Sequence, residues 1–162
     1  MNPSSINELF KSAKSLHEKK RKGSPDAFIL SWIAWEGTKL RMLAIGQKVK
    51  GIKIKDTYSN HKDLRLWEDK KFNNQWQKVF GKLPSSMPGK AGKIFRQLQG
   101  FKKYRDRIIH GKGLGNPTNI HEATKKLLEV LENKDWMKDI NIISKSKKFN
   151  LLDRFEKSKS RN

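Results

Sequence analysis

Apolar residues recur at three- and four-residue steps along most of this 162-residue chain, whereas the alternating pattern of β-strands is nearly absent. Such spacing gathers apolar side chains on one face of an α-helix, so the chain must bury its core by packing helix against helix. Its length suffices for one domain with a core and is short for two. We therefore predict an all-α fold, an up-and-down bundle of about four to five helices.

The segment SPDAF carries the most complete signals for a helix N-terminus. Ser24 is suited to the N-cap, Pro25 to the first helical position and Asp26 to the first turn. The broad apolar face that follows runs to Ala44 and predicts the central helix of the fold. Residues 46–60 are rich in lysine, and we expect them to be irregular apart from a short extended piece.

Further helices, one of them long, are expected before and after this central helix. Their apolar spacing covers Ile6–Leu16, Leu64–Phe80, Ile94–Ile109, Ile120–Leu131 and Trp136–Ile143. Gly111 is placed to end the helix that begins near Ile94. Asn119 and Glu122 have the spacing of a capping box that would open the next one. Most tryptophans lie at core spacing, which favours buried packing over stacking on nucleic-acid bases.

We expect one helical domain over residues 1–143 and a basic C-terminal tail over residues 144–162. The tail is rich in lysine and serine. It contains four large apolar residues, Phe149, Leu151, Leu152 and Phe155. The tail either docks on the domain through these residues or remains a flexible basic arm.

The charge balance restricts the partners of the chain. Lysine and arginine number 37 against 16 acidic residues, a formal net charge of +21. So large a positive field favours polyanions, of which nucleic acid is the usual one. A proteome rich in lysine, or a surface that serves only solubility, would explain the same charge. Because lysine dominates over arginine, phosphate attraction is favoured over base readout.

Composition also bears on location and cofactors. Cysteine is absent, which excludes disulfides and thiolate metal sites and fits a reducing compartment. No stretch approaches the roughly 20 apolar residues that span a bilayer, and the N-terminus lacks the pattern of a secretory signal. We therefore expect a cytoplasmic protein with no membrane partner. His17, His61 and His121 are isolated from carboxylates at ligand spacing, so neither a metal nor another cofactor is expected.

The stretch KYRDRIIHGKG, Lys103 to Gly113, places a histidine directly before the glycine that should end its helix. The step from Arg105 to His110 is a turn of about 140° and a rise of about 7.5 Å, so a straight helix would not lay them side by side. Asp106 and Arg107 lie closer to His110 in angle. The arginine would reach the histidine through its own length, a deviating helix end or a second copy of the site.

Electrostatics acts on His110 in both directions. Asp106 and the negative end of the helix dipole favour the imidazolium, whereas the surrounding lysines and arginines disfavour it. Histidine is suited to proton transfer at neutral pH, and arginine to holding an anionic phosphorus centre. The alternative is that His110 only satisfies carbonyl groups at the C-terminal end of its helix.

The segment YRDRIIHG, Tyr104 to Gly111, resembles the R-polar-x-x-x-H motif of the HEPN superfamily. These are small all-α domains, many of which are metal-independent endoribonucleases in toxin–antitoxin, phage-defence and RNA-processing systems. The matching residues are Arg105, Asp106 and His110. Many members have asparagine where this chain has Asp106.

A second likeness lies in SWIAWEGTKLRML, Ser31 to Leu43, which is similar to the early helix of the same family. An acidic residue often follows small and aromatic residues there, and Glu36 would be that residue. With the intervening architecture, the resemblance covers about Phe28 to Leu131.

The resemblance implies that RNA is cut by its own 2′-hydroxyl, which attacks the adjacent phosphorus and leaves a 2′,3′-cyclic phosphate and a 5′-hydroxyl end. His110 would move the proton and Arg105 would hold the scissile phosphate. Asp106 or Glu36 would orient one of the two. The resemblance further implies a homodimer that brings two motifs to one cleft, and an antitoxin or regulatory protein as partner. The residues expected to bind RNA are Lys103, Tyr104, Arg107 and Lys112.

Two other functions fit the same residues. One is a non-catalytic helical protein that binds RNA or DNA, supported by the net charge and the tryptophans. The other is a catalytically silent domain that binds another protein. Cleavage of RNA without added metal, abolished in His110→Ala, separates the enzyme from both.

Overall fold

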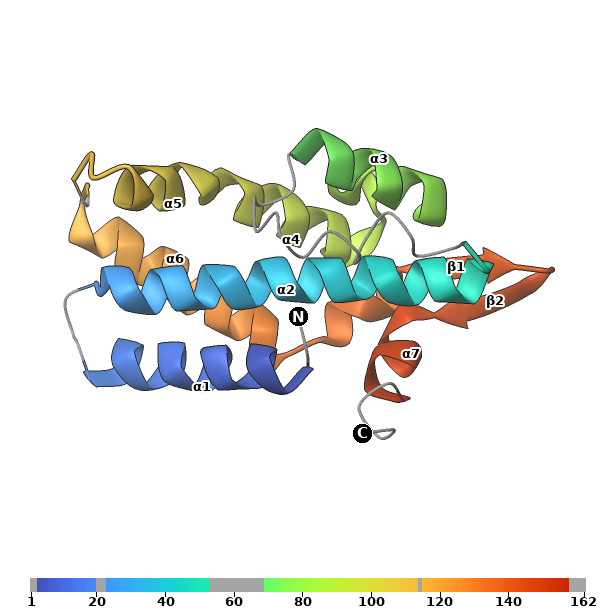
Figure 1. Ribbon diagram of the computed structural model, residues 1–162, viewed down its shortest axis with the longest axis horizontal. Coiled ribbons are helices and arrows are strands. Elements are labelled where there is room, and N and C mark those ends of the chain that lie inside the picture. The colour runs from blue at the N-terminus through green and yellow to red at the C-terminus, as the bar shows by residue number, and fades with distance from the viewer. Residues whose placement is uncertain (1–2, 20–22, 53–68, 114, 158–162) are drawn as a thin grey trace. The chain divides into compact units, whose positions relative to one another are not determined.

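The structure is a computed structural model that describes residues 3–19, 23–52, 69–113 and 115–157 (Figure 1). These ranges are mostly helical and contain one small two-stranded sheet, which confirms the predicted mainly α-helical class. The helices are α1 (Pro3–Lys19), α2 (Pro25–Lys50), α3 (Asp69–Phe80), α4 (Gly89–Gly100), α5 (Lys102–Ile109), α6 (Pro117–Glu132) and α7 (Leu151–Lys157). Short 3₁₀ helices lie at Pro84–Ser86 and Asp135–Asp139. None of the helices in the described ranges is long and apolar enough to cross a bilayer.

Several expectations concern segments outside the described residues. They are the extended piece around Ile54, the isolated His61, and the last residues of the tail. The start of the helix expected from Leu64, with Trp67, also lies outside them. Within the described residues, the chain divides into two compact units. The first unit comprises Met1–Lys39 and Arg96–Lys134, and the second comprises Leu40–Phe95 and Asp135–Asn162. The expected domain boundary at residue 143 stays a prediction.

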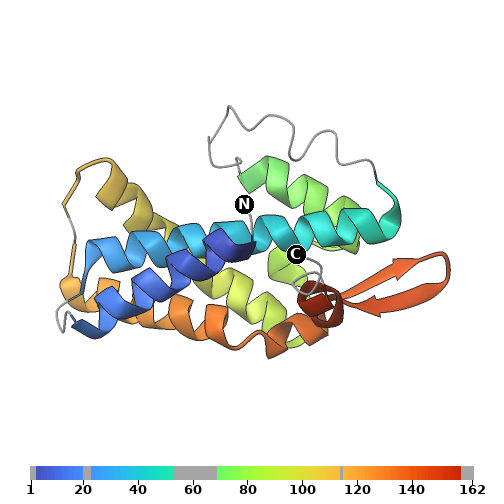
Figure 2. The same ribbon diagram turned by 60° about the horizontal axis from the view of Figure 1, so that its bottom comes forward.

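In the first unit, α1 packs along α6, as both ribbon views show (Figures 1 and 2). The rings of His17 and His121 stack between these helices with centroids 4.3 Å apart. Lys14 Nζ reaches Glu132 Oε1 at 2.8 Å further along the same interface. Helix α6 buries the apolar face that the sequence predicted, with Ile120, Ala123, Leu127, Leu128 and Leu131 inside.

The expected capping box at Asn119 is wrong, because α6 begins earlier. Asn116 is the N-cap, and its side chain accepts a hydrogen bond from Thr118 N at 2.9 Å. Pro117 then occupies the first helical position, where its missing N–H leaves no bond unmade. A start at Asn116 satisfies one free backbone N–H group and places proline where no N–H is needed. The helix therefore begins there and not at the predicted capping box three residues later.

Helix α2 begins as predicted and ends later than predicted. Ser24 is buried, and its Oγ accepts a hydrogen bond from Ala27 N at 3.3 Å. The irregular segment expected from Gly46 is wrong for its first residues, because the helix continues to Lys50. Gly46 is buried, and a Cβ there would collide with the side chains of Val79 and Phe80 of α3. The glycine therefore permits close packing between helices and does not end one.

An aromatic chain forms the core of the second unit. The ring centroids of Trp76 in α3 and Phe95 in α4 lie 5.1 Å apart, and Phe95 meets the Trp136 ring at 5.9 Å. With Trp32 and Trp35 of the first unit, both of these tryptophans are buried, which confirms their core assignment. Each aromatic ring removes a large apolar area from water and stabilises the unit accordingly.

The second unit contains a two-stranded antiparallel sheet that the sequence did not predict (Figure 2). Strand β1 (Asn141–Ser144) pairs with β2 (Lys147–Asn150), and Ser144 lies opposite Lys147. The two turn residues Lys145 and Ser146 have φ of 48° and 63°, the left-handed conformation that a two-residue hairpin turn requires. Glycine or asparagine usually marks such a turn, and neither is present.

Residues of the predicted tail form β2 and α7. Leu151, Leu152 and Phe155 are buried. Arg41 of α2 donates from Nη2 to the backbone oxygen of Phe155 at 3.3 Å and lies 4.5 Å from the centre of its ring. These contacts hold the start of the tail within the second unit.

Candidate functional site

The helix expected from Ile94 to Ile109 is broken near its middle into α4 and α5. Phe101 lies between them with φ −81° and ψ −10°. Its carbonyl oxygen accepts hydrogen bonds from Tyr104 N at 3.0 Å and from Arg105 N at 3.4 Å, so the first turn of α5 is tightened. No residue of α5 is buried. Ile109 is 55% exposed, so its predicted inward position is wrong.

Helix α5 ends where the sequence predicts. His110 is the C-cap, with φ −87° and ψ 9°, and its N–H donates to Asp106 O at 3.0 Å. Gly111 follows with φ +63°, a conformation that glycine adopts without strain. The N–H groups of Gly111 and Lys112 bond the carbonyls of Ile108 and Arg107.

These backbone hydrogen bonds bear on the interpretation that His110 only satisfies carbonyl groups at the end of its helix. The terminal carbonyls of Asp106, Arg107 and Ile108 already accept backbone N–H groups, so they do not require the imidazole. The side chain of His110 is exposed and contacts no hydrogen-bond or ion-pair partner within the described ranges. Its two ring nitrogens are therefore accessible to a ligand.

Arg105 is held firmly beside this helix end. Its side chain is only 15% exposed, and Nη1 pairs with Asp106 Oδ1 at 3.0 Å. Its Nε is buried and has no acceptor among the residues that the structure describes. A buried N–H without a partner is costly, so this nitrogen favours the arrival of an anionic acceptor. The structure thus brings Arg105 and Asp106 together.

The other predicted site residues lie partly on or next to α5, beside Arg105 and Asp106, and partly on another helix. Glu36 of α2 pairs with Lys39 Nζ at 2.9 Å on its own helix. In the described part of the chain, no hydrogen bond or ion pair joins Glu36 to Arg105 or His110. Lys103 Nζ lies 5.2 Å from the ring centre of Tyr104, while Arg107 and Lys112 are exposed near the helix end.

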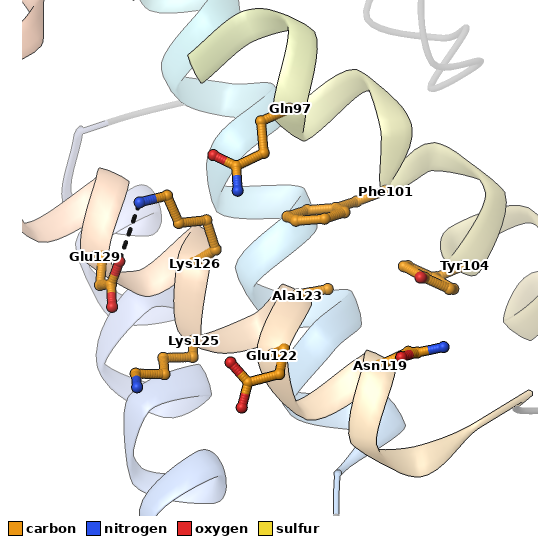
Figure 3. Close-up of a pocket in the computed structure, with 9 residues that line it drawn as sticks. All are labelled: Gln97, Phe101, Tyr104, Asn119, Glu122, Ala123, Lys125, Lys126 and Glu129. Carbon is orange, nitrogen blue, oxygen red and sulfur yellow. Dashed lines mark hydrogen bonds and ion pairs between the residues drawn. The ribbon is translucent and has the colours of Figure 1, made fainter. Parts of the chain in front are cut away.

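A pocket of about 340 Å³ adjoins this helix within the first unit (Figure 3). It is lined from α4, α5 and α6 by Gln97, Phe101, Tyr104, Asn119, Glu122, Ala123, Lys125, Lys126 and Glu129. Such a volume is at the lower end of the range for small-molecule sites. Two rings, two amides and four charged groups surround it, so it can hold a flat polar molecule.

The sequence interpretation placed only Tyr104 of these residues in the site. Phe101 was expected in the core and Asn119 in a cap. The segment FKKYR does interleave aromatic and basic residues at helical spacing, which is a weak signal for a binding surface. Only the tertiary structure shows that Phe101 and Asn119 line a common pocket.

The imidazole of His17, which stacks on His121 between α1 and α6, has a shifted pKa. Burial, and then the neighbouring His121, lower the pKa of His17 below its ordinary value of 6.5; Glu18 and Glu122 oppose this shift. In the ranges that the structure describes, no three histidine or acidic side chains gather in a geometry that could hold a metal ion.

Compared with protein families, curated proteins and solved structures, the chain matches no family model and shows no significant similarity to any curated protein or solved structure.

Proposed function

We propose that the chain is a metal-independent endoribonuclease with a bundle of HEPN type. The observation that carries the proposal is that one short segment carries both an exposed imidazole, His110, and an arginine, Arg105, whose buried Nε has no acceptor in the described chain. The two groups supply a proton carrier and an anion holder on one short helix. The net charge of +21 favours a polyanionic substrate such as RNA.

In the proposed reaction, the 2′-hydroxyl oxygen forms a bond to the adjacent phosphorus as His110 removes its proton. The bond from phosphorus to the 5′-oxygen breaks, and the departing oxygen takes up a proton from the imidazolium of His110, which returns the histidine to its neutral form. Arg105 stabilises the charge that develops on the phosphate oxygens. Asp106 positions the guanidinium through its ion pair of 3.0 Å, which is the role the resemblance assigned to an acidic residue. Glu36 has a weaker claim to this role, since it pairs with Lys39.

A homodimer supports this chemistry better than a single chain. The two residues diverge by about 140° around a regular helix, and His110 leaves the helical conformation at the C-cap. Two copies of α5 facing one another would place the histidine of one chain near the arginine of its partner. A toxin–antitoxin or phage-defence role, with an antitoxin or regulator as a further partner, follows from the same resemblance.

The test is incubation of the purified full chain with single-stranded RNA in the presence of a chelator. We expect cleavage products that end in 2′,3′-cyclic phosphate, and we expect His110→Ala to abolish them while RNA binding persists. The matched control is Lys48→Ala, which removes an exposed cation from the last turn of α2, outside the residues expected to bind RNA. Equal cleavage by wild type and His110→Ala would contradict the proposal.

The second candidate is a non-catalytic RNA-binding protein of the same fold. It is favoured by the pocket lined with Phe101 and Tyr104, because partly exposed aromatic rings stack on unpaired bases without any catalytic group. Salt-sensitive binding with no cleavage by the wild type would select this function.

A further inference from the structure

The pocket beside α5 presents two aromatic rings that are fixed in place. Phe101 and Tyr104 have ring centroids 6.2 Å apart, with planes inclined by 34°. The Tyr104 ring also meets Phe28 of α2 edge-on, with centroids 6.2 Å apart and an interplanar angle of 86°. Both rings are partly exposed toward the pocket. Rigid, half-covered rings offer stacking surface at little cost in conformational entropy.

The opposite wall of the pocket is α6 (Figure 3). Ala123 is buried there, and its small side chain leaves room for a flat molecule between the helices. Gln97 of α4 and Asn119 of α6 add amide groups that donate and accept hydrogen bonds. The pocket therefore combines apolar faces with polar edges.

The charge around the pocket is balanced although the chain as a whole is strongly basic. Lys125 and Lys126 are offset by Glu122 and Glu129, and Lys126 Nζ pairs with Glu129 Oε2 at 3.2 Å. A phosphate would meet two carboxylates here, whereas an uncharged ring with N–H groups would find acceptors. Glu122 is exposed, and no ion pair to it is found in the described chain.

We infer that this pocket binds one unstacked nucleobase of a single-stranded RNA, and that it favours a base with an exocyclic amino group. The inference rests on the proposed function for its choice of RNA. Phe101 and Tyr104 stack on the base, while Glu122 accepts a hydrogen bond from the amino group. Uracil lacks an amino group and presents carbonyl oxygens that the carboxylate repels.

This assignment gives the candidate active site a substrate anchor. Tyr104 of the pocket directly precedes Arg105 on α5, so the arginine lies one residue from the pocket lining. The pocket, with its carboxylates, would then bind the base of a nucleotide. Arg105 and the cations at the helix end would bind its phosphate.

The experiment measures binding in a His110→Ala background, so that cleavage does not interfere. Labelled oligoadenylate, oligouridylate and an abasic ribose-phosphate strand of equal length are titrated by fluorescence anisotropy at one salt concentration. The variants are Phe101→Leu, Tyr104→Leu and Glu122→Gln, each checked by circular dichroism. Phe149→Leu is the matched control, because this ring of β2 is also partly exposed and lies 4.4 Å from Arg154 Cζ, outside the pocket.

We expect Phe101→Leu and Tyr104→Leu each to weaken oligoadenylate binding roughly tenfold and to leave abasic-strand binding unchanged. Glu122→Gln should reduce the preference for oligoadenylate over oligouridylate, and Phe149→Leu should change neither. Phe101 lies between two helices, and its substitution could prevent folding. In that case Tyr104→Leu and Glu122→Gln test the same inference.

Equal binding of oligoadenylate by wild type and Tyr104→Leu would overturn the inference, and so would equal affinity for oligoadenylate and the abasic strand. Cleavage by the wild type is assayed separately. Pocket-dependent binding without cleavage would support the inference and contradict the proposed nuclease. Cleavage with no effect of the pocket variants on binding would overturn the inference alone.

Discussion

Helices α5 and α6 are neighbours in the chain and use their residues in opposite ways. Helix α6 buries seven residues, Ile120, Ala123, Thr124, Leu127, Leu128, Val130 and Leu131, whereas α5 buries none. Helix α6 is capped by the side chain of Asn116, which accepts a hydrogen bond from Thr118 N, and α5 has no side-chain cap. A helix that adds so little to the core is free to be selected for its chemistry. Helix α6 therefore contributes to the stability of the first unit, whereas α5 carries most of the candidate site residues.

After the loss of cleavage expected for His110→Ala, the largest expected effect concerns the arginine of α5. Arg105→Ala should reduce RNA cleavage by about 10²–10³-fold, because it removes the group that stabilises the charged phosphate. Initial cleavage rates on one RNA substrate check this, with Arg107→Ala as the matched control. A greater loss in Arg107→Ala would move the site to the residue three positions before His110 and weaken the resemblance.

The second prediction concerns the buried face of α6. Leu127 is fully buried, so Leu127→Ala should lower the free energy of unfolding by about 2–5 kcal/mol. Ile109→Ala on α5 should change it by less than about 0.5 kcal/mol, since that side chain is 55% exposed. Urea denaturation measures both. Similar losses in the two variants would remove the distinction between the helices.

The third prediction is a pH dependence carried by the interface of α6 with α1. The pKa of His17 is lowered in the folded chain, so the unfolded chain binds the proton more readily. This contribution to stability is therefore complete above the ordinary pKa of 6.5 and is lost as the pH falls below it. Thermal unfolding between neutral and mildly acidic pH tests this.

The matched variant for the pH prediction is His17→Phe, which keeps an aromatic ring against His121 and cannot be protonated. It should show a smaller drop in melting temperature on acidification than the wild type. An identical drop in the two proteins would show that another group carries the acid sensitivity.

The smallest effect is expected at an exposed cation of α5. Arg107→Ala should weaken RNA binding only modestly and lower the slope of log affinity against log salt by about one. Anisotropy titrations at several salt concentrations measure this slope. An unchanged slope would indicate that Arg107 contacts no phosphate.

Short-range rules determined much of this fold. Ser24 and Pro25 start α2 and Gly111 ends α5, because caps depend on hydrogen bonds within one turn of the chain. The spacing of apolar residues likewise identified the buried face of α6 and the buried tryptophans. The candidate pair of Arg105 and His110 was found in the same way, from residues close in sequence.

Long-range packing decided the rest. Only the contact with Val79 and Phe80 shows that Gly46 is a packing residue, and only the folded second unit holds Lys145 and Ser146 in the left-handed conformation. The pocket depends on residues from three helices, so no local pattern contains it. The sequence alone determined where helices form and which residues could do chemistry, since those depend on neighbouring atoms. Which side chains share a pocket required the tertiary structure, because burial depends on residues distant in the chain.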